Sequence, residues 1–312
     1  MKKLCKPLAL FFALLFLLTS CASGASSPNS AEARYTFTDS AGYTVTVKKT
    51  PTRVAVLLSS FADVWGLAGG KVAITVGESV DRGFCDTSVT LVDDGAGKTI
   101  NTEVLIASAP DFVILSADIP AQVEAAALCR EAGIPVAQMR VECFAEYLAL
   151  LKICTDLTGR PELYELHGTA QKAQIDAVLA KKPLDGMRIL FIRAGSSARS
   201  VKPKGSADHF AAAMLKELGA TNIADDAPLL LDGLSMEAIL AADPDYIFFT
   251  AVGDEDASRA FVTEMLKNAD WAALSAVKNG RFSYLQKDLF HYKPNGNWAL
   301  AYANLTQITK GE

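Results

Sequence analysis

A pattern of fifteen residues occurs twice in this chain, once in each half. Residues 101–115 read NTEVLIASAPDFVIL, and residues 235–249 read SMEAILAADPDYIFF. Both copies place a glutamate third, then an apolar stretch with helical spacing, then Pro-Asp and a run of aromatic or β-branched residues typical of a strand. Because the same helix–turn–strand unit occurs in both halves, we predict two lobes of similar fold.

The first turn of each repeated helix carries matched polar residues. Asn101 and Ser235 belong to the residue types that cap helix N-termini. Glu103 and Glu237 then lie in the first turn, where the helix dipole favours a carboxylate. A helix start accounts for one such acid, but it explains less well why both halves place an acid at the same repeat position.

Strand-like and helix-like segments alternate along the rest of the chain, which indicates an α/β fold with parallel sheets. Residues 161–181 have apolar residues spaced for one helix about 30 Å long. The predicted organisation is an N-terminal lobe over residues 34–159, a bridging helix over 160–182 and a C-terminal lobe over 183–312. The predicted strands are 53–57, 112–115 and 135–138 in the first half and 188–193, 246–250 and 281–285 in the second. A β-hairpin is predicted over 35–47, and the final helix is expected to begin near Pro294.

The N-terminus has the pattern of a processing signal rather than of folded structure. Three lysines precede a purely apolar run over residues 8–18, which is too short to span a bilayer. The following Leu-Thr-Ser-Cys ends at Cys21 and resembles the lipobox of bacterial lipoproteins, in which the cysteine is lipidated. We therefore expect a signal peptide over residues 1–21 and a small, Ser-rich flexible tether over 22–33. An ordinary signal peptide with a chance cysteine is the alternative.

Composition and motif spacing exclude several classes of function. The net charge of −5 is spread along the chain and argues against nucleic acid, which needs a basic face. No C-x-x-C spacing suggests a zinc ribbon or a redox motif, and a disulfide among the four cysteines at 85, 129, 143 and 154 is left open. The chain contains neither G-x-S-x-G nor H-E-x-x-H, so no catalytic or metal-binding residues are assigned.

The loops that follow the predicted strands are the expected ligand site, because two-lobe α/β proteins bind ligands beyond the carboxyl ends of their strands. The loop over 193–204 carries four cations and no acid, which favours an anionic ligand. A solvated basic loop is the alternative. The four cations are Arg193, Arg199, Lys202 and Lys204, and the other candidates for ligand contact are Ser60, Phe61, Arg82, Phe84, His291 and Tyr292. The aromatic side chains offer flat apolar contacts, although each ring taken alone is more typical of ordinary packing.

A set of short motifs, taken in order, resembles the solute-binding proteins of ABC importers for ferric siderophores, haem and cobalamin. In the first half these motifs are Asp39-x-x-Gly42, Pro51-x-Arg53-Val-Ala-Val, Leu105-x-x-x-x-Pro110-Asp111 and Gly133-Ile-Pro-Val136. In the second half they are MLKELGATN over 214–222, Leu234-Ser-x-Glu237, Asp243-Pro-Asp245 and the segment 271–281. The resemblance covers the chain from about Phe37 to its end.

The resemblance implies a fold, a partner and a location. It implies two Rossmann-like lobes joined by a single long helix, with a metal chelate bound between them and only a small closure on binding. It implies that Glu103 and Glu237 dock on arginines of an importer whose permease and ATPase subunits are the partners. It also implies a monomer with no resident cofactor, held outside the cytoplasm on the bacterial membrane by its lipid alone.

Several readings of the ligand and activity remain open at this stage, and one of them is a related binding module that senses or acts as a scaffold instead of serving an importer. A ferric siderophore is expected first and haem or a corrinoid next; haem would require an axial ligand such as His209, His291, Tyr292 or Met139. A free divalent metal ion is disfavoured because the chain has three scattered histidines. A lipoprotein enzyme of α/β fold is disfavoured because no nucleophile–base pair is recognisable.

Overall fold

A computed structural model describes residues 33–94, 99–225 and 235–309 of the chain. The predicted signal peptide, the lipidation candidate Cys21 and nearly all of the predicted tether lie outside these residues. Among the residues that are described, no helix is long and apolar enough to cross a membrane.

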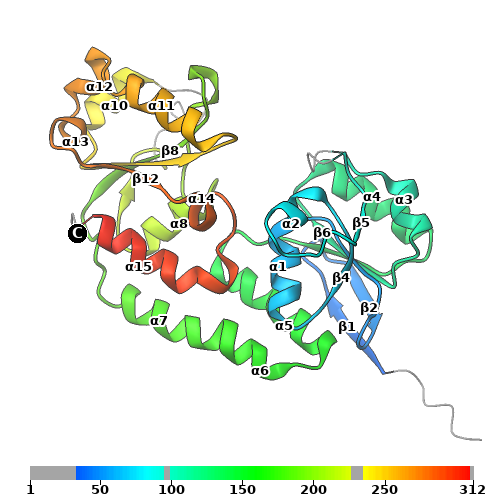
Figure 1. The fold of residues 1–312 in the computed structure, drawn as a ribbon. Coiled ribbons are helices and arrows are strands. Elements are labelled where there is room, and N and C mark those ends of the chain that lie inside the picture. The colour runs from blue at the N-terminus through cyan, green and yellow to red at the C-terminus, as the bar shows by residue number, and fades with distance from the viewer. Residues whose placement is uncertain (1–32, 95–98, 226–234, 310–312) are drawn as a thin grey trace, which may run out of the picture. The chain divides into compact units, whose positions relative to one another are not determined.

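The first lobe is built on a five-stranded parallel sheet in the order β5-β4-β3-β6-β7 (Figure 1). Its strands are β3 (Val54–Val56), β4 (Val72–Thr75), β5 (Thr90–Leu91), β6 (Phe112–Ser116) and β7 (Val136–Met139). The central strands β3 and β6 are buried along their whole length, as expected for parallel strands covered on both faces. The helices are α1 (Ser59–Leu67), α2 (Gly77–Asp81), α3 (Thr102–Ala107), α4 (Pro120–Glu131) and α5 (Phe144–Thr158). The predicted hairpin forms a separate two-stranded sheet of β1 (Arg34–Thr38) and β2 (Thr44–Lys48).

The second lobe has a sheet in the order β10-β8-β11-β12, with a short antiparallel strand β9 added on β8. Its strands are β8 (Arg188–Ala194), β9 (Lys202–Pro203), β10 (Thr221–Asn222), β11 (Tyr246–Ala251) and β12 (Phe282–Leu285). Its helices include α8 (Phe210–Glu217), α10 (Met236–Ala242), α11 (Glu255–Met265), α12 (Ala269–Ala273), α13 (Ser275–Lys278), α14 (Lys287–Phe290) and α15 (Trp298–Ile308). The expectation of two α/β lobes with parallel sheets is confirmed. The strands β4, β5, β9 and β10 were not predicted, because each is short and has little alternation.

The internal repeat corresponds to equivalent structure in the two lobes. Asp111 and Asp245 each follow the repeat proline and each bridge to the start of the neighbouring central strand. The Asp111 amide donates to the Arg53 carbonyl at 3.1 Å, and its carboxylate accepts from the Arg53 amide at 3.0 Å. The Asp245 amide donates to the Arg188 carbonyl at 2.7 Å, and its carboxylate accepts from the Arg188 amide at 2.8 Å. The Pro-Asp turn therefore joins helix to sheet in the same way twice.

The chain between the sheets is helical from Pro161 to Leu179, but it is not one regular α-helix. It consists of α6 (Pro161–Tyr164), a π-helical turn (Glu165–Thr169) and α7 (Ala170–Leu179). The π turn contains Gly168, where an added Cβ would lie 2.9 Å from a methyl group of Leu148 on α5. This close approach explains why the helix passes α5 at a glycine, and π turns of this kind interrupt α-helices at single positions. The predicted helix is thus found with an irregular turn and with an end two residues earlier than expected.

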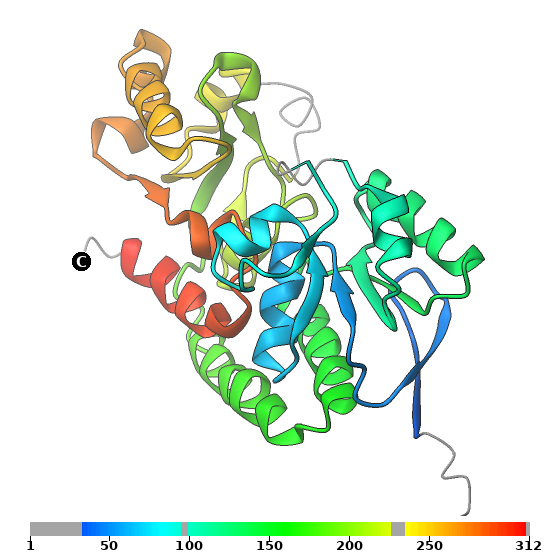
Figure 2. The ribbon, with the colours of Figure 1, turned by 45° about the vertical axis from the view of Figure 1, so that its right-hand side comes forward.

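One hydrophobic core extends through both lobes. Its buried members include Ile114 of the first sheet and Phe191 and Phe248 of the second. Trp298 at the start of α15 connects the two sides, because its ring lies 6.0 Å from that of Phe144 in the first lobe and 5.8 Å from that of Phe210 in the second. α15 also runs beside α7 of the bridging helix, as Figures 1 and 2 show. A core shared in this way opposes large relative movement of the lobes.

Candidate ligand-binding site

The order of the strands places the candidate site at the carboxyl edges of both sheets. In the first sheet the strand order reverses at β3, and in the second it reverses at β8. Ligands of open α/β sheets bind in the crevice at such reversal points. Ser59 and Ser60 come two residues after the end of β3, and Arg193 lies near the end of β8. These residues mark the carboxyl edge of each sheet, where Ser59 and Ser60 are themselves buried.

Arg82 of the first lobe reaches across to the second lobe. Its guanidinium lies 3.8 Å from the ring centre of Tyr292 and 4.7 Å from that of Phe84. Its Nη1 donates to Ser59 Oγ at 3.0 Å and approaches Ser60 Oγ at 3.4 Å. The structure therefore brings together four of the residues expected to contact ligand: Ser60, Arg82, Phe84 and Tyr292. A cation stacked on aromatic rings is held in place while it keeps its charge.

Positive charge gathers around two histidines of the second lobe. Burial lowers the pKa of His291 to about 4, with the neighbouring charges of Arg193, Lys287, Arg82 and Lys293 acting in the same direction. The same cause lowers the pKa of His209 to about 3, with smaller effects from nearby cations that include Lys293, Arg193 and Lys204. His209 Nδ1 also accepts a hydrogen bond from the Ala211 amide at 3.2 Å, which requires an unprotonated nitrogen. Two neutral imidazoles thus lie within a cluster of cations, where a ligand of negative charge is favoured.

The low pKa values of the histidines predict how stability depends on pH. In the unfolded chain both groups titrate near pH 6.5, whereas in the fold their pKa values are about 3 and 4. The folded protein binds fewer protons than the unfolded chain in this window. The contribution of the two histidines to the free energy of unfolding is therefore fully present above pH 6.5 and is lost as the pH falls toward 4. Each histidine contributes a slope of at most about 1.4 kcal/mol per pH unit. We expect His291→Gln to reduce this slope in urea unfolding measured at several pH values.

His209→Asn is the matched variant for the second histidine, because asparagine keeps an acceptor at the N-cap of α8 and does not titrate. The double variant should show the flattest profile below pH 6.5. An acid-side slope equal to that of the unaltered protein in both single variants would show that other groups govern it.

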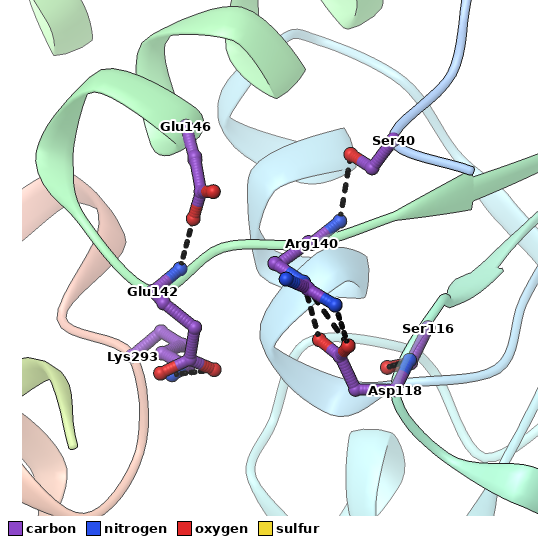
Figure 3. A network of polar contacts seen from close by, with 7 residues as sticks. All are labelled: Ser40, Ser116, Asp118, Arg140, Glu142, Glu146 and Lys293. Carbon is purple, nitrogen blue, oxygen red and sulfur yellow. Dashed lines mark hydrogen bonds and ion pairs between the residues drawn. The ribbon is translucent and has the colours of Figure 1, made fainter. Parts of the chain in front are cut away.

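A second contact between the lobes is an ion pair (Figure 3). Lys293 of the second lobe donates to Glu142 Oε1 of the first at 2.7 Å, and its ammonium lies 4.5 Å from the ring centre of Phe210. The Lys293 side chain is only 18 % exposed. Burial lowers the pKa of Lys293, and the attraction of Glu142 offsets part of this effect. A carboxylate of the other lobe thus stabilises the charged form of Lys293 against the effect of burial.

At the edge of the first lobe, charged side chains pair with each other in a further network. Arg140 donates to both carboxylate oxygens of Asp118, through Nε at 3.0 and 3.1 Å and through Nη2 at 2.5 Å (Figure 3). The Arg140 amide donates to Ser40 Oγ at 3.0 Å, and the Asp118 amide donates to Ser116 Oγ at 3.1 Å. Asp118 holds the pKa of Arg140 above its usual value through this hydrogen bond. These loops are therefore fixed against each other, and the cations left for a ligand lie mainly on the second lobe.

Residues of both lobes line a cavity of about 500 Å³. Asp63, Asp81, Arg82 and Phe84 come from the first lobe, and Asp288, Lys293, Pro294 and Asn297 come from the second. The volume falls within the range of small-molecule sites. Arg82 and Lys293 are shared between this cavity and the cation cluster, so the two form one continuous candidate site.

The structure places the remaining candidates differently. Phe61 is 3 % exposed and packs in the shared core, so its ring presents no surface to a ligand here. Arg199 and Lys202 are exposed, and no carboxylate among the described residues pairs with them. Several residues of the site were not singled out from the sequence, among them Glu142, Lys287, Lys293 and the cavity carboxylates Asp63, Asp81 and Asp288. Lys293 stands in the Lys-Pro-Asn triplet next to His291 and Tyr292, and that proximity was the available signal.

The two repeat glutamates are exposed at helix starts. Asn101 Oδ1 accepts from the Val104 amide at 3.0 Å, and Ser235 Oγ accepts from the Ala238 amide at 3.3 Å. Glu103 and Glu237 lie in the first turns that these caps begin. Neither forms an ion pair with another residue of the described chain. Both carboxylates are therefore free to meet a separate protein.

The described residues show neither a cluster of metal ligands nor a disulfide bond. They contain no group of three or more His, Cys, Asp or Glu side chains placed to hold a metal ion. The cysteines at 85, 129, 143 and 154 are free thiols, and the last has a pKa raised by complete burial. The site thus offers cations, aromatic rings and neutral imidazoles, together with the carboxylates of Asp63, Asp81 and Asp288 in the cavity lining.

Two α/β lobes with a charged site at their facing edges define a binding protein that takes a small ligand between its lobes. The chain belongs to the periplasmic binding protein family, whose sequence model matches residues 54–289. This is a family of binding proteins and not of enzymes. No curated protein sequence matches the chain.

Solved structures with the same fold come from distant relatives. BauB, a siderophore-binding protein bound to ferric iron and two acinetobactin molecules, has a TM-score of 0.70 at 16% identity and covers 89% of this chain and 98% of its own. BtuF, the vitamin B12-binding protein of Vibrio cholerae, has a TM-score of 0.68 at 18% identity, covering 84% and 97%. The petrobactin-binding protein YclQ from Bacillus subtilis has a TM-score of 0.67 at 18% identity, covering 89% and 98%. At these identities the likeness establishes the fold.

Proposed function

We propose that this chain is the extracytoplasmic substrate-binding component of an ABC importer and that it captures an anionic metal chelate, with a ferric siderophore as the first candidate. The observation that carries the proposal is the cluster of cations between the lobes. Arg82 from one lobe and Arg193, Lys204, Lys287 and Lys293 from the other surround two neutral histidines. Catecholate and carboxylate groups of a siderophore are acceptors that such cations bind well. The siderophore and petrobactin named for BauB and YclQ support the same ligand class.

Haem or a corrinoid is the second candidate, and one side chain favours it. The Nδ1 of His291 is buried and has no hydrogen-bond partner within the described chain. The low pKa of this histidine keeps the imidazole neutral near pH 7, which is the form that ligates a metal. Tyr292 follows directly, with its ring 5.0 Å from that of His291. An axial ligand of this kind is what haem requires from a protein.

Native mass spectrometry of the protein purified from its own host tests the ligand class. A ferric siderophore adds the mass of an iron chelate and absorbs broadly in the visible range. Haem adds a different mass and gives a strong absorption band that His291→Ala should shift. A mass that fits a bare divalent ion would contradict the proposal, because the cation cluster disfavours such a ligand.

We also propose that Cys21 is lipidated and anchors the mature chain to the outer face of the cell membrane. The charged start, the short apolar run and Leu-Thr-Ser-Cys support this. Cys21→Ser is expected to release the protein into the medium or periplasm, or to leave it at precursor mass, when cell fractions are compared by immunoblotting. Cys5→Ser is the control, because Cys5 would be removed with the signal peptide. Unchanged membrane retention and mature mass in Cys21→Ser would contradict the anchor.

A further inference from the structure

Asn295 is a buried polar residue in an unusual conformation, and its side-chain nitrogen and backbone carbonyl form hydrogen bonds. It is 1 % exposed, and its φ of 45° lies in the left-handed region that residues other than glycine rarely adopt. Its Nδ2 donates to the Ser60 carbonyl at 2.7 Å and to Asp63 Oδ2 at 2.9 Å. Its own carbonyl accepts from Gln171 Nε2 at 3.1 Å. A strained conformation persists where surrounding contacts determine it, and here they do.

The partners of Asn295 belong to three parts of the fold. Ser60 and Asp63 lie on α1 of the first lobe, Gln171 lies on the bridging helix, and Asn295 itself precedes α15. Asn295 and Ser60 are 235 residues apart in the chain. The side chain of Asn295 therefore joins its segment to α1, and the backbone carbonyl of Asn295 joins the same segment to the bridging helix.

Gln171 extends the connection along the bridging helix. Its Oε1 accepts from the Ala299 amide at 3.1 Å, and its Nε2 also donates to the His167 carbonyl. That carbonyl lies in the π turn and accepts in addition from the Tyr147 hydroxyl of α5 at 3.0 Å. The carbonyl of His167 in the π turn thus accepts hydrogen bonds from a side chain of the bridging helix and from a side chain of the first lobe.

The same network ends at the ligand site. Ser60, whose carbonyl accepts from Asn295, presents its Oγ to Arg82. Asn295 in turn follows directly on the segment that holds Tyr292 and Lys293 at the site. Asn295 therefore lies between the group of site residues supplied by α1 and α2 and the group supplied by the second lobe.

We propose that Asn295 is a positioning residue of the ligand site, which holds the start of α1 and its partner Arg82 at a fixed distance from the segment carrying His291, Tyr292 and Lys293. The expected change in ligand affinity rests on the proposed function, whereas the positioning itself is a property of the protein without ligand. Removing the side chain should allow the start of α1 and the segment carrying Tyr292 to sample a wider range of separations, within the limits that the shared core sets. If the competent arrangement were present one tenth of the time, apparent affinity would fall about tenfold.

The variants distinguish the effect of losing the side-chain hydrogen bonds from the effect of the strained backbone conformation. Asn295→Gly removes the side chain and adopts the positive φ without cost, so any defect comes from the lost hydrogen bonds. Asn295→Asp keeps the shape but turns a carboxylate toward Asp63 and the Ser60 carbonyl. Combining it with Asp63→Asn restores one donor–acceptor pair in the opposite direction. Asn279→Gly, at an exposed asparagine with one local hydrogen bond, is the matched control.

The primary measurement is the distance between the lobes in the folded, ligand-free protein. Spin labels at Ala127→Cys on α4 and Ala260→Cys on α11 report it, because both alanines are exposed. This requires serine at the native cysteines that labels can reach. We expect one narrow distance in the parent protein and the control, a broad distribution in Asn295→Gly and Asn295→Asp, and partial narrowing in the double variant. Where Asn295→Gly does not fold, Gln171→Leu should give the same broadening.

Binding of an iron(III) tris-catecholate complex, followed by quenching of tryptophan fluorescence, is the second measurement. Asn295→Gly should weaken binding about tenfold through slower apparent association, because only the competent fraction of the ligand-free protein binds, and the double variant should recover part of the loss. A narrow, unchanged distance in folded Asn295→Gly overturns the positioning role whatever the ligand is. A broadened distance in a protein whose parent does not bind the complex supports the positioning role and counts against the proposed ligand class instead.

Discussion

Replacing Glu103 and Glu237 together by alanine is expected to abolish uptake of the chelate by cells and to leave its binding by the purified protein unchanged. Both carboxylates are exposed, lie at equivalent positions of the internal repeat and have no partner within the described chain. An importer with two membrane subunits would receive one acid from each lobe. Charge pairs that lose water in an interface cost about 2–5 kcal/mol when one partner is removed, so loss of both acids should reduce transport far more than tenfold.

The comparison of transport with binding separates docking from a purely structural role. Loss of a first-turn acid costs the fold only about 0.3–1 kcal/mol, so both single variants should remain folded and bind ligand normally. Glu131→Ala is the control, because that glutamate is exposed at the end of α4 and is not part of the repeat pattern. Each single variant should fall between the parent and the double variant. Normal transport by the double variant would mean that these acids serve only to start their helices.

Replacing Arg82, Arg193 and Lys204 by glutamine is expected to abolish binding of an anionic ferric chelate by the purified protein. These three cations come from both lobes, and each lies close enough to His291 or His209 to lower its pKa. Charge-assisted hydrogen bonds contribute about 1.5–3 kcal/mol each, so the triple variant should bind at least a hundredfold more weakly. Titration of the purified variants with the iron(III) tris-catecholate complex measures the change.

Arg199→Gln with Lys202→Gln is the matched control for this experiment. Both cations lie in the same basic loop, but they are exposed and do not affect either histidine. We expect this pair to change affinity only slightly. If it weakens binding as much as the triple variant does, the ligand lies farther out on the loop that joins β8 to β9.

The shared core explains why binding is expected to move the lobes little. Trp298, Phe144 and Phe210 form aromatic contacts from one lobe to the other, and α15 packs along the bridging helix. Opening the lobes widely would separate these rings, of which Trp298 and Phe210 are buried, and expose the apolar area between them. The charged contacts Arg82–Tyr292 and Lys293–Glu142 lie nearer the ligand site, where small adjustments suffice to admit a ligand.

The repeat, its helix caps and its Pro-Asp turns were determined by the sequence alone, because each depends on residues close together in the chain. Asn101 caps the helix that begins next to it, and the turn at Asp111 follows directly from the residues around it. The same local logic predicted that Glu103 and Glu237 lie in the first turns of their helices. Alternating strands and helices were likewise sufficient for the two parallel α/β lobes, since hydrophobic period and turn residues are local signals.

The site itself was decided only by the tertiary structure. Lys293 meets Glu142 across 151 residues of chain, and Asn295 meets Ser60 across 235. No periodicity predicts such pairs, because they depend on how two separately predictable lobes pack on a shared core. The burial of Phe61 and the π turn at Gly168 have the same origin, since each results from the close approach of elements that the sequence does not place side by side.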